Sequence, residues 1–188
     1  MPETLPKPNL DHPVFGVVKA QFPGTRFRAT EFRGLSTLIV EPGDLLRTMR
    51  FLKEDPRCAF NFLSDVTGVD YLNYPATMPG RFGVVYNLVS HSRDDRFIVK
   101  TFLNPSLPTD GTQDDPALYL DSVTPLWSGA EWTEREVFDM LGIRFRGHPD
   151  LRRILTWEDF PAHPLRKDYP LRGRGERESY RVVDRNSA

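Results

Sequence analysis

Two stretches in the middle of the chain alternate their side chains with a period of two, and they most constrain the fold. The run 82–89 (FGVVYNLV) places Phe, Val, Tyr and Leu at every second position, and the run 96–103 (RFIVKTFL) places Phe, Val and Thr likewise. Such alternation is typical of strands with one buried face. The short polar connector between them has a turn composition, Ser92-Arg93-Asp94-Asp95. We therefore expect an antiparallel strand pair at the centre of the molecule.

The flanking sequence adds helices and shorter strands around this pair. Near-helical spacing of apolar residues and turn residues at segment ends predict these elements. The expected helices cover residues 12–22 and 45–53, and the expected short strands cover residues 25–32, 35–41, 59–63 and 66–71. The pattern indicates a single α+β domain over residues 14–142, with an antiparallel sheet packed by helices. A Pro-rich segment of residues 1–13 is expected to be flexible.

The last helix has the most complete set of sequence signals. Ser128 and Glu131 match an S-x-x-E capping box, and Gly142 supplies a C-terminal stop. Glu131, Arg135 and Asp139 are spaced four residues apart, which predicts a ladder of charges on one exposed helix face. Two interpretations of that face remain open at this point, a solvated surface and a binding surface.

Residues 143–188 differ from the rest in charge and in spacing. Residues 144–188 carry 11 basic and 7 acidic side chains, whereas residues 1–143 carry 14 basic and 19 acidic ones. Proline and glycine interrupt the segment, and its apolar residues are not spaced to form a core of their own. The pattern predicts an extended arm, pre-stiffened by proline, that docks on another polypeptide. Its expected ionic contacts are Arg152, Arg153, Arg166 and Lys167.

Composition disfavours several classes of function. Cys58 is the only cysteine, so a disulfide, a four-thiolate iron–sulfur cluster and a Cys-rich zinc site are all excluded within the chain. His148 and His163 lie 15 residues apart without a partner four residues away, which disfavours a metal or hydrolase site. Acidic residues interleave the C-terminal arginines, which disfavours nucleic acid. No signal peptide and no apolar run of about 20 residues is visible, so we expect membrane association only through partners.

A motif in the last third carries a resemblance to a known family. The chain reads EREVFDMLGIRFRGHPDLRRIL from residue 134 and HPLRKDYPL from residue 163. This resembles the 30 kDa subunit family of proton-translocating NADH:quinone oxidoreductase (respiratory complex I). The positions that match its signature are Glu134, Arg135, Glu136, Asp139, Met140, Leu141, His148, Arg152, Ile154 and Leu155. Weaker similarity reaches back through residues 60–71 and 82–103.

The resemblance implies a non-catalytic subunit of the peripheral arm. It would bind no cofactor itself, because FMN and the iron–sulfur clusters belong to other subunits. It would brace the quinone-site subunit and its neighbours, on the cytoplasmic side of the cell membrane. The residues expected at the partner interface are Glu134, Arg135, Glu136, Asp139, His148, Arg152, Arg153, His163, Arg166, Lys167 and Asp168. Alternatives are a homologous subunit of a membrane-bound hydrogenase or a ferredoxin-fed plastoquinone reductase, and a stand-alone hydrolase.

Overall fold

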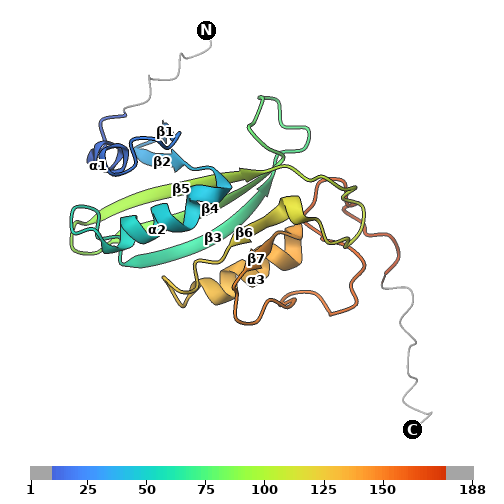
Figure 1. Cartoon of the computed structure of the whole chain (residues 1–188). Helices are drawn as coiled ribbons and strands as arrows, with labels where there is room; N and C mark the ends of the chain where they lie inside the picture. Colours follow the sequence, from blue (N-terminus) through green and yellow to red (C-terminus); the bar gives the residue numbers. More distant parts are fainter. Residues whose placement is uncertain (1–9, 177–188) are drawn as a thin grey trace.

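A five-stranded sheet forms the centre of the protein, which is described here by a computed structural model covering residues 10–176 (Figure 1). The strands are β1 (Arg28–Phe32), β2 (Leu35–Ile39), β3 (Phe62–Asp70), β4 (Phe82–Ser90) and β5 (Asp95–Leu103). Their order across the sheet is β1-β2-β5-β4-β3. The α+β class is confirmed, but the sheet is mixed, because β2 pairs with β5 in parallel while the other pairs are antiparallel. A parallel pair needs a long crossover, and here the crossover contains a helix and two strands.

The expected central hairpin is present. β4 and β5 pair antiparallel from Phe82 opposite Leu103 to Ser90 opposite Asp95. The alternation works as predicted, since Val84, Tyr86 and Leu88 are buried on the core face and the residues between them are only half-buried.

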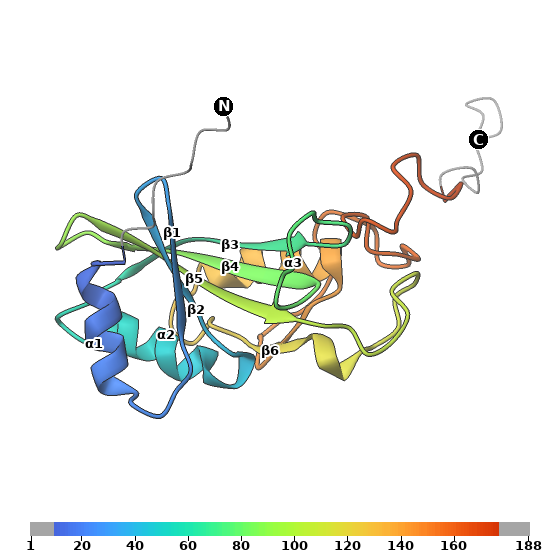
Figure 2. The ribbon, with the colours of Figure 1, turned by 90° about the horizontal axis from the view of Figure 1, so that it is seen from above.

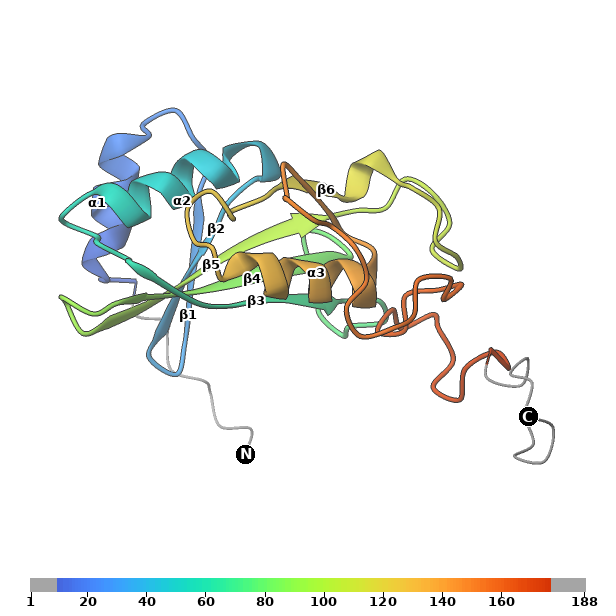
Figure 3. The same cartoon turned by 90° about the horizontal axis from the view of Figure 1, so that it is seen from below.

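Two helices cover one face of this sheet and a third lies beside them (Figures 1 and 3). Helix α1 spans Pro13–Gln21, α2 spans Leu45–Glu54 and α3 spans Ala130–Leu141. Figure 2 looks onto the opposite side of the sheet, where the strands lie in front of α2 and α3. Apolar residues of all three helices join the strands in one core cluster. None of the helices among residues 10–176 is long and apolar enough to cross a membrane.

The N-terminal end of α3 differs from the sequence prediction. The helix begins at Ala130 with Gly129 as N-cap, and no side chain caps it. The capping box of Ser128 and Glu131 is therefore wrong, because the chain turns through Gly129 before the helix starts. The C-terminal end is as expected, with Gly142 in the left-handed conformation at φ 75°.

Two very short strands were not predicted. β6 (Tyr119–Asp121) and β7 (Arg144–Arg146) form a two-stranded parallel sheet beside α3. Ile143 and Phe145 are buried in the core. The folded body therefore continues past the expected boundary at residue 142, because β7 needs β6 as its partner.

Residues 147–176, which we call the C-terminal segment, contain turns and irregular backbone but no helix or strand. They lie against the end of α3 and the loop of residues 104–115 (Figure 3). The short helical turns expected at 151–155 and 157–160 are absent from this part of the chain. Residues 1–9 of the expected flexible N-terminus and residues 177–188 of the expected arm lie outside the described residues.

Candidate functional site at the C-terminal end of α3

Asp139 is the centre of a buried polar cluster on α3. Its side chain is 0% exposed. One carboxylate oxygen accepts hydrogen bonds from the backbone N–H groups of residues 154, 155 and 156, at 3.0, 2.7 and 2.8 Å. The other accepts from Arg153 Nη1 at 2.7 Å and from Thr156 Oγ1 at 2.5 Å. A single carboxylate thus fixes the path of the C-terminal segment beside the helix.

These bonds also set the charge state of Asp139. Burial by itself raises the pKa of a carboxyl, because it disfavours the ionised form. The hydrogen bonds from Thr156, Leu155 and Arg153 outweigh burial and lower the pKa of Asp139 to about 2. Asp139 is therefore ionised throughout the physiological range.

Arg153 binds the segment to itself as well as to the helix. Its guanidinium donates to the backbone carbonyl oxygens of Phe160 (2.8 Å) and Ala162 (3.0 Å), in addition to Asp139. Five donors in a fixed planar fork suit such a junction. Arg135 works in the same direction, because its Nε and Nη2 donate to the carbonyl oxygens of Arg152 and Arg153 at 3.1 Å each.

The HPLR motif completes the end of α3. The last four carbonyl groups of a helix have no partner within the helix. Here Gly142 N–H donates to Phe138 O, His163 Nδ1 to Asp139 O, Leu165 N–H to Met140 O, and Arg166 Nε to Leu141 O, at 2.8, 2.8, 3.1 and 2.8 Å. All four carbonyls are satisfied, three of them by residues 163–166. Arg166 also donates to the carbonyl oxygens of Thr109 and Gly111.

We use the name α3 cluster for Arg135, Asp139, Arg153, Thr156, His163 and Arg166. Gly142 makes the close approach of this cluster possible. A Cβ atom at residue 142 would lie 2.3 Å from Arg166 Nη2 and 2.6 Å from His163 Nε2.

A second polar group ties the C-terminal segment to the sheet. Asp70 at the end of β3 forms two hydrogen bonds with Arg81 and accepts from the backbone N–H of Lys167 at 2.9 Å. Arg81 also pairs with Asp168 at 2.9 Å, and Thr109 donates to the same carboxylate oxygen. The sequence analysis missed Asp70 and Arg81 as site residues, although Asp70 lies in the stretch with weaker family similarity.

Glu134 occupies a separate buried position on α3. Its carboxylate accepts from Ser122 Oγ at 2.6 Å and from the backbone N–H of Val123 at 2.8 Å. The side chain is 0% exposed. Burial raises the pKa of Glu134 to about 7, even though the bonds from Ser122 and Val123 oppose the shift.

This pKa predicts a pH-dependent effect of Glu134→Gln. The folded chain keeps the carboxyl protonated up to about pH 7, while the unfolded chain releases the proton near pH 4.5. The wild type therefore loses stability as the pH rises from 4.5 to 7, by about 3 kcal/mol in total for this group. Glutamine does not ionise, so the free energy of unfolding of Glu134→Gln should gain about that much on the wild type across this window.

Urea unfolding at pH 4.5, 6 and 7.5 measures this difference. Glu136→Gln is the control, because it removes an exposed carboxyl from the same helix. A constant difference between Glu134→Gln and wild type at all three pH values would contradict the expectation.

The structure separates the predicted interface residues into buried and exposed ones. Arg135, Asp139, His163 and Arg166 are buried, so the expected exposed charge ladder on α3 is wrong. Arg153 and Arg166 were expected as outward ionic contacts, but both are bound to backbone and carboxylate oxygens of their own chain. His148 is half-buried, with Nε2 bonded to Glu131 O at 2.9 Å. The exposed residues of the predicted set are Glu136, Arg152, Lys167 and Asp168.

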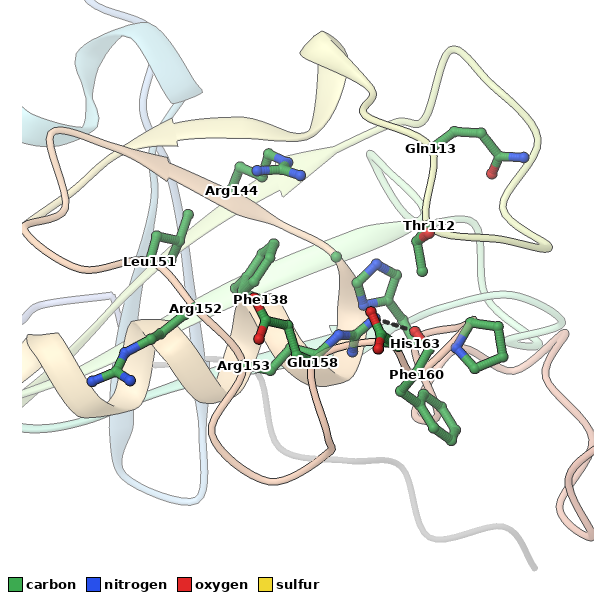
Figure 4. A pocket seen from close by; sticks show the side chains of 13 residues that line it. Thr112, Gln113, Phe138, Arg144, Leu151, Arg152, Arg153, Glu158, Phe160 and His163 are labelled. Atoms are coloured by element: carbon green, nitrogen blue, oxygen red, sulfur yellow. Dashed lines mark hydrogen bonds between the residues drawn. The ribbon is translucent and has the colours of Figure 1, made fainter. Parts of the chain in front are cut away.

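A pocket of about 530 Å³ opens between α3 and the C-terminal segment (Figure 4). Phe138, Arg144 and His163 line it from the body, and Arg152, Arg153 and Phe160 line it from the segment. Thr112 and Gln113 close it from the loop before β6. Among residues 10–176, no group of three or more His, Cys, Asp or Glu side chains is placed to hold a metal ion. The geometry therefore supports attachment and recognition by this region.

The fold and the α3 cluster together define a class of protein. It is an α+β domain in which buried charges hold a long irregular C-terminal segment against the last helix. A family model described as "Respiratory-chain NADH dehydrogenase, 30 Kd subunit" matches residues 38–175. The chain belongs to this family, and the resemblance seen in the sequence is confirmed.

Individual relatives agree with this assignment. An NADH-quinone oxidoreductase subunit of Citrifermentans bemidjiense is 43% identical over 164 residues, which cover 87% of this chain and 91% of the relative. Subunit 5 of Thermus thermophilus NADH-quinone oxidoreductase is 50% identical over 117 residues, covering 60% of this chain and 52% of that one.

Two solved structures share the fold. A structure described as the trypsin-resistant fragment (1-134) of Nqo5 matches with a TM-score of 0.59 and 33% identity, covering 73% of this chain and 96% of the fragment. A chain of the archaeal membrane-bound sulfane sulfur reductase matches with a TM-score of 0.64 and 21% identity, covering 92% of both chains, and supports the fold alone.

Proposed function

We propose that the chain is a structural subunit of the peripheral arm of a proton-translocating NADH:quinone oxidoreductase. In this proposal it carries no redox centre, and it holds the quinone-site subunit and its neighbours in position. Electrons would pass from NADH through FMN and iron–sulfur centres of the other subunits to quinone. The chain would reach the cytoplasmic face of the membrane through those partners.

The single observation that carries the proposal is the apolar outer surface of the C-terminal segment. Leu155 and Leu165 are 63% and 59% exposed, and Leu171 is fully exposed. Trp157 and Phe160 lie edge to face beside them, with ring centroids 4.7 Å apart. A groove of about 610 Å³ runs between these side chains and Tyr169. Contiguous exposed apolar side chains of this kind mark protein–protein contact surfaces.

Pre-ordering of the segment strengthens this argument. The α3 cluster and Asp70 fix the backbone of residues 153–168 at many points before any partner arrives. A surface that is already ordered loses less conformational entropy on binding. The partner contact should then depend on Leu155, Trp157, Leu165 and Leu171, with exposed Arg152 and Lys167 at its edge. The buried arginines would act by positioning this surface.

The proposal predicts a specific assembly defect. Leu155→Ser/Leu165→Ser should reduce the recovery of the quinone-site subunit with this chain at least about tenfold, since each leucine buried at a contact is worth roughly 1.5–3 kcal/mol. The folding stability of the isolated chain should change by less than about 0.5 kcal/mol per site, because both side chains are exposed. Tagged full-length chain purified from host membranes, followed by native mass spectrometry, measures the recovery.

Leu10→Ser/Leu35→Ser is the matched control, because these leucines are exposed to a similar degree on the other part of the molecule. Recovery of the quinone-site subunit equal to wild type in Leu155→Ser/Leu165→Ser would overturn the proposed contact. A wild-type chain that brings down no subunit of the oxidoreductase would overturn the proposed function as a whole.

A further inference from the structure

The pocket of Figure 4 contains one polar atom whose position calls for a ligand. His163 is 5% exposed, and its Nδ1 donates to Asp139 O at 2.8 Å. That bond places the ring proton on Nδ1. Burial and the neighbouring Arg166 and Arg153 lower the pKa of His163 to about 4, although the bond to Asp139 opposes the shift. The imidazole is therefore neutral at pH 7, and its Nε2 is a hydrogen-bond acceptor.

Nothing within the described residues donates to this acceptor. Nε2 faces Gly142, which also lines the pocket and whose missing Cβ leaves the ring edge uncovered. Phe138 lies beside the ring with centroids 6.2 Å apart, so the Nε2 edge is bordered by an aromatic wall. A neutral acceptor in such a place is satisfied by an N–H or O–H group from outside.

The charges of the pocket select the kind of donor. Its three arginines each have a carboxylate partner already: Arg144 pairs with Asp114 at 3.0 Å, Arg152 with Asp150 at 2.7 Å and Arg153 with Asp139 at 2.7 Å. Glu158 and Asp159 also line the pocket, are exposed, and have no ion-pair partner among residues 10–176. The uncompensated charge at this opening is therefore negative.

We propose that this pocket receives a basic side chain of a partner polypeptide, which donates to His163 Nε2 and pairs with Glu158 and Asp159. The inference rests on the proposed function, because it names what the partner would offer at one point of its contact. Charge-assisted hydrogen bonds from a guanidinium or ammonium are shorter and stronger than neutral ones. The pocket would therefore set the register of the partner, while the apolar surface around Leu155 and Leu165 supplies contact area.

The first test uses the full-length chain and a small probe. N-acetyl-arginine-N-methylamide is titrated against chain labelled with 15N in its histidine rings. The Nε2 resonance of His163 should shift on binding, and Glu158→Gln/Asp159→Asn should weaken the probe at least fivefold. Glu54→Gln/Asp94→Asn removes two exposed carboxylates elsewhere and should leave the binding unchanged. N-acetyl-aspartate-N-methylamide, which has the opposite charge, should cause no shift at His163.

The second test uses the assembled complex. Recovery of partner subunits with Glu158→Gln/Asp159→Asn should fall at least fivefold at 0.3 M salt, with Tm of the isolated chain unchanged. Wild-type recovery in that variant, or a His163 resonance that ignores the basic probe or follows the acidic one, would overturn the pocket proposal while the proposed function stands. Loss of all partners from the wild-type chain would instead overturn the proposed function.

Discussion

Asp139→Asn is expected to lower the free energy of unfolding by about 3–5 kcal/mol, as found when one partner of a buried ion pair is removed. The amide keeps the shape of the side chain but loses the charge that Arg153 needs. It also replaces one acceptor oxygen by a donor, in a place where backbone N–H groups and Thr156 all donate. For a chain of this size the melting temperature should fall by roughly 10 °C.

The acid side of the stability curve gives an independent check. The pKa of Asp139 is lowered from 3.8 to about 2 in the folded chain. A lowered pKa means that the stabilisation is complete above pH 4 and is lost as the pH falls through 4 towards 2. The difference between wild type and Asp139→Asn should therefore shrink by about 2 kcal/mol between pH 5 and pH 2.

Asp150→Asn is the control for this variant. Asp150 pairs with Arg152 at 2.7 Å, but that pair is largely exposed, so its loss should cost less than about 1 kcal/mol. Calorimetry and urea unfolding at pH 7 measure both variants. If Asp139→Asn and Asp150→Asn unfolded at the same urea concentration, Asp139 would not be the point that anchors the segment.

Gly142→Ala is expected to cost about 3 kcal/mol or more, which places it among the exceptional single substitutions. A left-handed backbone costs a residue with a Cβ roughly 1–2 kcal/mol. The new methyl group would also lie 2.3 Å from Arg166 Nη2 and 2.6 Å from His163 Nε2. Both side chains would have to move, and they hold the carbonyl groups of Leu141 and Asp139.

Gly147→Ala separates the two contributions. Gly147 has nearly the same φ, 77°, but a Cβ there would meet nothing within 4 Å. It should cost about 1–2 kcal/mol through backbone conformation alone. The excess of Gly142→Ala over Gly147→Ala measures the steric part. Equal losses in urea unfolding would show that the cap tolerates a methyl group.

The sheet and the helices were largely predictable from the sequence because their signals are local. Alternation over 82–89 and 96–103 reports burial on one face, and it fixed the central hairpin correctly. The parallel pairing of β2 with β5 was not predictable in this way, since it joins strands about 60 residues apart and no turn specifies it. β6 and β7 were missed because three residues are too few to show a period.

The charged residues of the last third were identified correctly as important, but their environment was misjudged. A spacing of four residues places Arg135 and Asp139 on one face of a helix, and it cannot say what covers that face. The cover is the backbone of residues 152–156, which has no regular secondary structure and hence no periodic signal. Arg153 and Arg166 looked like surface arginines for the same reason, because their acceptors are mainly backbone carbonyl groups that sequence does not mark.

The cap on α3 has a consequence for synthesis of the chain. Leu141 receives its hydrogen bond from Arg166, which the ribosome adds 25 residues later. Until then the end of α3 has open carbonyl groups and Asp139 faces an empty groove. The nascent domain is thus completed only when its final stretch emerges, and a prematurely terminated product carries a frayed helix end that quality-control proteases can recognise.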